Sequence, residues 1–120
     1  MEFIADSQIR AKLSFELAKC CAAIGDLGIA RRRLTDALID LPPGPLSQQA
    51  NLLLAEVSLK LNENKQAEDV CLQLLSHSID DEIKQKALNL LGQIYTQLEQ
   101  HDKAALAYAG IFDKIGETVP

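Results

Sequence analysis

The sequence contains no tryptophan, and aromatic residues make up only 4% of its 120 positions. Valine and threonine, which favour strands, are also scarce, so the apolar residues (48% of the chain) are mainly Leu, Ala and Ile. These residue types suit helices that pack closely through small side chains. With 24% charged residues, this composition predicts one ordinary folded domain over residues 1–120 and excludes a disordered chain.

An excess of positive charge is absent as well, because the formal net charge is -5. Affinity for nucleic acid comes mainly from neutralising phosphates, so we expect no nucleic-acid partner. The basic run Arg31 to Arg33 is interpreted as a solvated helix face. No apolar stretch approaches the roughly 20 residues that span a membrane, and the first residues lack the basic start and apolar core of a signal peptide. We therefore expect no direct membrane insertion.

Residues with catalytic or metal-binding chemistry are few. The cysteines Cys20, Cys21 and Cys71 are odd in number and include no Cys-x-x-Cys pair, and adjacent Cys20 and Cys21 point about 100° apart on a helix, so we expect no bond between them. A reduced, cytoplasmic compartment is therefore favoured, with the periplasm as the alternative. Cys21 and Cys71 occupy apolar positions and are interpreted as packing residues. His77 and His101 lack partners at metal-ligand spacing, and phosphate loops, dinucleotide turns and G-x-S-x-G elbows are absent. We expect no cofactor, no metal and no enzymatic activity.

What the sequence does contain is an internal repeat. The small residues Ala18, Ala55 and Gly92 each follow a Leu, and their numbers differ by 37 both times (18 to 55 to 92). Twelve residues after each of them stands an alanine, in the order Ala30, Ala67 and Ala104. Small residues at facing positions let two helices approach closely, so each repeat is expected to be an antiparallel helix pair. The expected repeats cover about 8–44, 47–78 and 80–116.

Helix boundaries follow from capping residues and from Gly and Pro. N-caps are expected at Ser7, Asp26, Ser47 and Asp80, and the six helices are expected to end near Ile24, Asp40, Leu61, Ser76, Leu98 and Gly116. In the first helix one apolar stripe is expected to pack in the core, formed by Leu13, Leu17, Cys20, Cys21 and Ile24. In the fifth helix the corresponding stripe holds Leu88, Leu91, Ile94, Tyr95 and Leu98.

This pattern resembles the tetratricopeptide repeat family, whose signature is W-x2-L-G-x2-Y followed by A-x3-F and P. Repeat three carries Leu91, Gly92 and Tyr95, then Ala104 and Tyr108, at that spacing. The resemblance covers about residues 8–116, although the repeat here is 37 residues long and not the usual 34. Longer repeats of this kind look like those of bacterial envelope lipoproteins and large bacterial repeat proteins.

The resemblance implies an all-α, right-handed superhelical solenoid whose first helices line a concave face that binds a protein or peptide. The outward-facing stripe of those helices gives the expected partner-binding residues: Phe15, Lys19, Leu52, Leu53, Glu56, Leu59, Lys86, Asn89, Leu90 and Gln93. The apolar members predict an apolar groove with a polar border, unless they pack against adjacent helices. A carboxylate clamp for chaperone tails is excluded, because Lys19, Leu53 and Leu90 stand at positions where the clamp needs Asn and Arg.

A second functional hypothesis is a purely structural segment of a longer solenoid, or a self-association surface. Such arrays usually finish with a polar capping helix, whereas only Gly116 to Pro120 follow the third pair. We therefore expect a fragment of a longer protein, or a homo-oligomer that forms through an apolar face with Ile111, Phe112 and Ile115.

Overall fold

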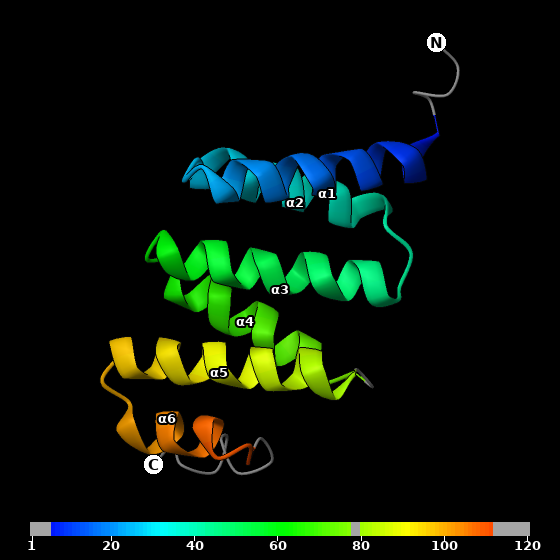
Figure 1. Cartoon of the computed structure of the whole chain (residues 1–120). Helices are drawn as coiled ribbons and strands as arrows, with labels where there is room; N and C mark the ends of the chain where they lie inside the picture. Colours follow the sequence, from blue (N-terminus) through cyan, green and yellow to red (C-terminus); the bar gives the residue numbers. More distant parts are fainter. Residues whose placement is uncertain (1–5, 78–79, 112–120) are drawn as a thin grey trace.

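The computed structural model describes residues 6–77 and 80–111, and all regular secondary structure within these ranges is helical. The helices form three antiparallel pairs: α1 (Ser7–Ala23) with α2 (Leu27–Asp40), α3 (Pro45–Lys60) with α4 (Asn64–Leu75), and α5 (Asp81–Gln97) with α6 (His101–Tyr108). Consecutive pairs pack through α2 on α3 and through α4 on α5. Figure 1 shows the resulting stack, which confirms the predicted all-α architecture.

The turn inside each pair has the same backbone geometry. Its central residue is left-handed, with φ values of 86° at Gly25, 63° at Asn62 and 60° at Glu99. The next residue donates its backbone N–H to a carbonyl five positions earlier, over 2.8 Å in all three turns. This pattern is the Schellman motif, which satisfies carbonyls that the helix end leaves free. Since 25, 62 and 99 differ by 37, the repeat seen in the side chains also governs the backbone.

Two of the expected N-caps are wrong by a few residues. Asp6, and not Ser7, caps α1, because its Oδ1 accepts hydrogen bonds from Gln8 N at 2.9 Å and from Ile9 N at 3.3 Å. Helix α3 begins at Pro45 after Gly44, and Ser47 lies inside its first turn. The Ser47 hydroxyl still contributes to the helix start, since its Oγ accepts from Gly44 N at 3.2 Å.

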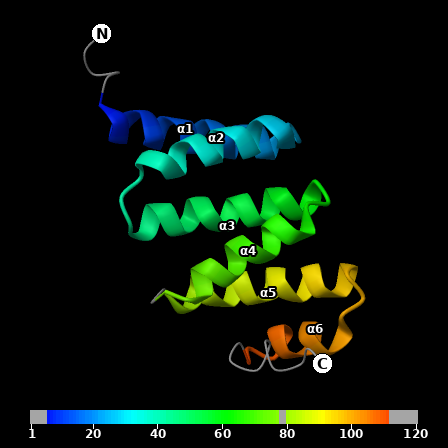
Figure 2. The ribbon, with the colours of Figure 1, turned by 180° about the vertical axis from the view of Figure 1, so that it is seen from behind.

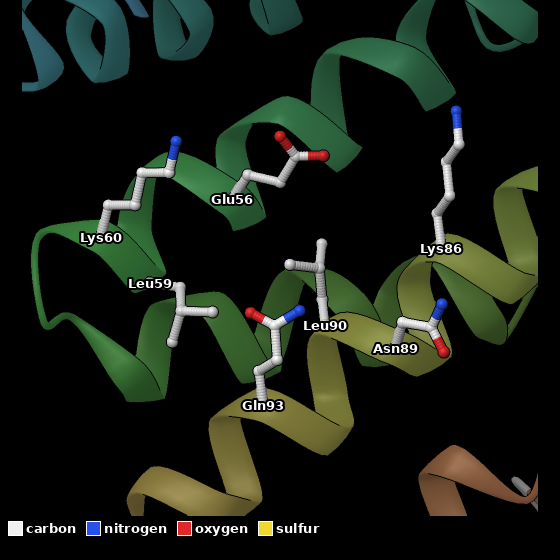
Figure 3. Close-up of a pocket in the computed structure, with 7 residues that line it drawn as sticks. All are labelled: Glu56, Leu59, Lys60, Lys86, Asn89, Leu90 and Gln93. Carbon is white, nitrogen blue, oxygen red and sulfur yellow. The ribbon is translucent and has the colours of Figure 1, made fainter. Parts of the chain in front are cut away.

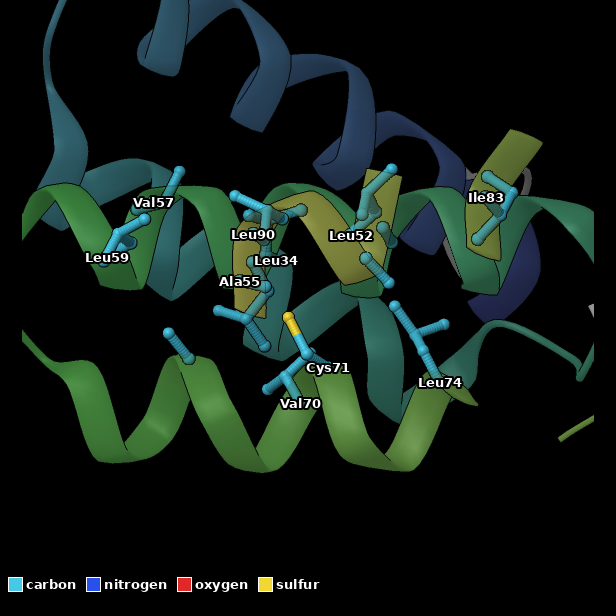
Figure 4. Close-up of a cluster of buried hydrophobic side chains, with 14 of the residues drawn as sticks. Leu34, Leu52, Ala55, Val57, Leu59, Val70, Cys71, Leu74, Ile83 and Leu90 are labelled. Carbon is cyan, nitrogen blue, oxygen red and sulfur yellow. The ribbon is translucent and has the colours of Figure 1, made fainter. Parts of the chain in front are cut away.

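The core runs through the stack along the positions that the repeat predicts. All six small residues at the pair contacts, Ala18, Ala30, Ala55, Ala67, Gly92 and Ala104, are buried. Figure 4 shows one stretch of this core, where Cys71 and Leu74 of α4 point toward α3. Small residues bring the paired helices together, and the larger apolar residues fill the space beside them.

The apolar stripe expected to be buried on α1 is exposed, which corrects the prediction. Leu13 is 52% exposed, Leu17 42% and Ile24 79%, and Cys20 is also exposed, while Cys21 is partly buried. The side of α1 that packs in the core carries Ala11, Phe15 and Ala18 instead. The equivalent stripe of α5 is buried from Leu88 to Tyr95, as expected, with only Leu98 exposed.

Helix α6 ends at Tyr108, well before the predicted end near Gly116. The chain turns at Gly110, which has a φ of 78°, and Ile111 N donates to Leu106 O at 2.9 Å. A left-handed residue cannot continue a helix, so this turn closes α6 after two turns. Ile111 is 44% exposed, in line with the expected open face, whereas Phe112 and Ile115 lie outside the described residues.

Candidate functional site

The first helices of the three pairs, α1, α3 and α5, lie side by side on one side of the stack (Figure 1). The second helices α2 and α4 lie in front in the view from behind (Figure 2). Two hollows open between the first helices. One, of about 400 Å³, lies between α3 and α5, and the other, of about 300 Å³, is lined by α1, α3 and the start of α5. Both include Glu56 and Lys86, so they adjoin, and we call them together the first-helix groove.

All ten residues predicted to face a partner line this groove. The hollow with α1 includes Phe15, Lys19, Leu52, Leu53, Glu56 and Lys86. The hollow between α3 and α5 includes Leu59, Asn89, Leu90 and Gln93, together with Glu56 and Lys86. Sequence reasoning had omitted Asp80, Glu82 and Ile83, which line the groove from the start of α5. Glu82 lies four residues before Lys86, so the helical period from Lys86 could have identified it.

The apolar members of the set do not form an open apolar surface, contrary to the expected strip. Phe15 is only 2% exposed, Leu52 and Leu59 are 6% exposed, and Leu90 is 8% exposed. Leu53 is partly buried. These side chains pack between neighbouring helices, which is the alternative that the sequence had left open. The exposed residues that line the groove are therefore polar, over an apolar floor.

Figure 3 shows this arrangement between α3 and α5. Leu59 and Leu90 point into the gap between the two helices, and polar side chains surround them. Glu56 and Lys60 come from α3, whereas Asn89 and Gln93 come from α5. Each wall of the groove thus contributes polar groups to one shared space.

The charges of the groove alternate in sign. Lys19 Nζ lies 2.9 Å from Glu16 Oε2 and 4.9 Å from the centre of the Phe15 ring. Lys86 Nζ lies 3.3 Å from Glu82 Oε1. Burial raises the pKa of the Glu56 carboxyl above its usual value, and the positive charges of Lys60 and Lys86 oppose that rise. With carboxylates and ammonium groups interleaved, the groove does not present one sign of charge to a ligand.

Neutral amides supply the remaining polar groups of the groove. Gln85 Nε2 donates to Asn89 Oδ1 at 3.3 Å, which orients the Asn89 amide. Gln93 lies one helical turn further along α5 and is exposed, and Gln49 lines the other hollow from α3. Each of these side chains carries both a donor and an acceptor. Together they can form hydrogen bonds with the peptide groups of an extended chain.

The described residues offer no alternative centre with metal chemistry. No group of three or more His, Cys, Asp or Glu side chains in these ranges could hold a metal ion. Cys71 is buried, as expected for a packing residue, and burial raises the pKa of its thiol to about 12. It is therefore a neutral thiol at physiological pH, and not a reactive thiolate. Within the ranges 6–77 and 80–111 no helix has the length and apolar character to cross a membrane.

The basic run behaves as a solvated helix face. Arg31 pairs with Glu63 across the boundary between the first and second pairs, through Nη1 and Oε1, and both side chains are partly exposed. Arg32 and Arg33 are exposed on α2. These arginines lie on a second helix, away from the first-helix groove.

Comparison with known proteins agrees with this architecture. The family model of the tetratricopeptide repeat-like domain matches residues 4–119. The match covers nearly the whole chain, including all three helix pairs. No curated protein and no solved structure matches the chain.

Proposed function

Because the chain belongs to the tetratricopeptide repeat-like family, as the match over residues 4–119 shows, we propose that it is a protein-interaction module whose first-helix groove binds an extended segment of a partner protein. Repeat architectures of stacked helix pairs present long surfaces that suit such segments. The proposed role is that of a scaffold or adaptor, without catalysis.

This proposal rests on a hollow that polar side chains of two helices line above a buried apolar floor. Glu56 and Lys60 of α3 line the hollow of about 400 Å³ together with Asn89 and Gln93 of α5 (Figure 3). The side-chain amides of Asn89 and Gln93, one helical turn apart on α5, favour an extended peptide, because its main chain offers a donor and an acceptor at nearly every residue. An amphipathic helix is a poorer fit, since its main-chain groups are already bonded and the apolar groove side chains are buried.

Mixed charge in the groove also bears on specificity. Lys19 and Lys86 each have a carboxylate within 3.3 Å, in Glu16 and Glu82. An acidic peptide would have to compete with those carboxylates, so strong selection for acidic ligands is not expected. We infer that the ligand is an uncharged or mixed-charge peptide, which the groove recognises mainly through hydrogen bonds to its main chain.

The experiment is selection of peptides from a random display library on the immobilised protein, followed by affinity measurement on matched variants. Asn89→Ala with Gln93→Ala removes two exposed groove amides and leaves the buried floor unchanged. Arg32→Ala with Asp36→Ala removes two exposed polar residues from α2 and serves as the control. We expect selected peptides to lose about tenfold affinity or more on the groove variant, corresponding to about 1.4 kcal/mol, and to keep it on the control. Equal affinity for both variants would refute the proposal.

A further inference from the structure

The exposed face of α1 carries an ordered apolar stripe. Ile9 is 47% exposed, Leu13 52% and Leu17 42%, and Cys20 is exposed as well. Residues four and three apart on a helix lie on one face, so these side chains form a continuous strip along α1. We call it the α1 stripe. It lies away from the first-helix groove, because none of its members lines either hollow.

The repeat register shows what normally covers such a stripe. Adding 37 to 13, 17 and 20 gives Ala50, Leu54 and Val57 of α3, which are 0%, 6% and 1% exposed. Adding 37 again gives Ala87, Leu91 and Ile94 of α5, all 0% exposed. Each of α1, α3 and α5 packs on the second helix of its own pair, and α3 and α5 also pack on a preceding pair, mainly through α2 and α4. The α1 stripe thus occupies the positions that are buried on α3 and α5, the two first helices that pack on a preceding pair.

The opposite end of the stack carries the complementary surface. Tyr108 is 50% exposed and Ile111 44% exposed. Subtracting 37 gives Cys71 and Leu74 of α4, which are 0% and 4% exposed, and subtracting it again gives Leu34 and Ala37 of α2, both 0% exposed. Unlike α6, both α2 and α4 pack on the first helix of a following pair, and these positions are buried there. We call Tyr108 and Ile111 the α6 end.

We propose that a second copy of this chain docks head to tail, with the α6 end of one copy seated on the α1 stripe of the next. The contact would repeat the two inter-pair packings that the chain already makes within itself, α2 on α3 and α4 on α5. The two surfaces lie at opposite ends of the stack, so they cannot meet within one molecule (Figure 1). A contact between different surfaces is heterologous, and it extends the stack from copy to copy into a ring or a filament.

The test uses two variants whose changes fall on residues that are already exposed. Leu13→Glu with Leu17→Glu blocks the α1 stripe, and Tyr108→Glu with Ile111→Glu blocks the α6 end. Ile111→Glu alone replaces the second variant if the change at Tyr108 unfolds the α5–α6 pair. Ile39→Glu, at an apolar residue of α2 that is 76% exposed, is the matched control. Circular dichroism verifies the fold of each protein, and light scattering coupled to size-exclusion chromatography gives its mass.

For the wild type and the Ile39 control we expect a mass that rises with concentration beyond one chain. Each blocked variant should remain a single chain when measured alone. An equimolar mixture of the two blocked variants should form dimers and nothing larger, because one intact α6 end then meets one intact α1 stripe. A wild type that stays a single chain at all concentrations would overturn the proposal. So would association that the α1 variant abolishes and the α6 variant leaves unchanged, since this would indicate a symmetric contact of two α1 stripes.

Discussion

The ring of Tyr108 lies against the backbone of Gly92, so close that a Cβ built on Gly92 would stand 2.5 Å from Cζ of that ring. In the other repeats the same position is Ala18 or Ala55, and the position of Tyr108 is held by Leu34 or Cys71. The size of the small residue on the first helix thus matches the size of its neighbour on the second. Alanine occurs opposite Leu and Cys, and glycine occurs opposite Tyr.

The first prediction tests this size match with a double-mutant cycle. In the wild type, Gly92→Ala should destabilise the protein by about 1 kcal/mol, because overpacking outweighs the gain in helix propensity. In a Tyr108→Leu background, which copies the Ala18 and Leu34 pairing, the same change should stabilise by up to about 1 kcal/mol. Urea denaturation measures all four proteins. If Gly92→Ala has the same sign in both backgrounds, the size match is not the reason for glycine.

The second prediction concerns the buried hydroxyl of Tyr95, which donates to Glu68 Oε2 at 2.8 Å and so links α5 to α4. Burial, with the neighbouring Glu68, raises the pKa of Tyr95 well above its usual value, so the hydroxyl stays protonated and remains a donor. Tyr95→Phe should lower the free energy of unfolding by about 1.5 kcal/mol, the usual range for a hydrogen bond to a charged group. Tyr108→Phe, at the half-exposed tyrosine, should change it by less than about 0.5 kcal/mol. Equal effects of the two substitutions would contradict the assigned role of the Tyr95 hydroxyl.

The third prediction concerns Glu99, which holds the left-handed position that Gly25 holds in repeat one. A residue with a Cβ costs about 1–2 kcal/mol in this conformation, and glycine avoids most of that cost. Glu99→Gly should therefore raise the free energy of unfolding by about 1 kcal/mol in urea denaturation. Glu99→Ala removes the same charge but keeps the Cβ, so it should give no such gain. A gain of similar size in both variants would attribute the effect to charge and not to backbone conformation.

The fourth prediction concerns pH. The pKa of Glu56 is raised in the folded protein above its ordinary value of 4.5, mainly by burial. The folded state therefore binds this proton more tightly than the unfolded state, and stability falls as pH rises from that ordinary value through the higher folded value. Glu56→Gln removes this dependence, so its stability relative to the wild type should increase between about pH 4 and pH 7. If the difference in unfolding free energy between Glu56→Gln and the wild type stays constant with pH, the pKa of Glu56 is not raised in the folded protein.

The sequence predicted the helix pairs well because the 37-residue register constrains many positions at once. Turns at Gly25, Asn62 and Glu99 follow that register, even though glutamate is an unusual residue for a left-handed turn. The early end of α6 was missed because Gly110 was read as part of a helix. Glycine can adopt either a helical or a left-handed φ, so the sequence alone does not reveal that Gly110 has a φ of 78°.

Burial was harder to predict than secondary structure. Periodicity shows which face of a helix is apolar, but not whether a neighbour exists to cover it. Leu13 and Leu17 have the same pattern as Ala50 and Leu54, yet only the latter are buried, on a helix that packs on a preceding pair. Conversely, Phe15 and Leu90 were assigned to an open groove and are buried. The helices α1, α3 and α5 pack on each other, and the apolar pattern of a single helix does not show such contacts.

Mapping of backbone amide shifts by NMR tests most directly whether a peptide binds across the first helices. A peptide selected on the wild-type protein is titrated into labelled protein, and the perturbed amides are placed on the structure. We expect the largest changes to cluster on α3 and α5 around Glu56, Lys60, Asn89 and Gln93. These changes should be absent from the variant that carries Asn89→Ala and Gln93→Ala. Changes concentrated on the outer faces of α2 and α4, or unaffected by that variant, would contradict this expectation.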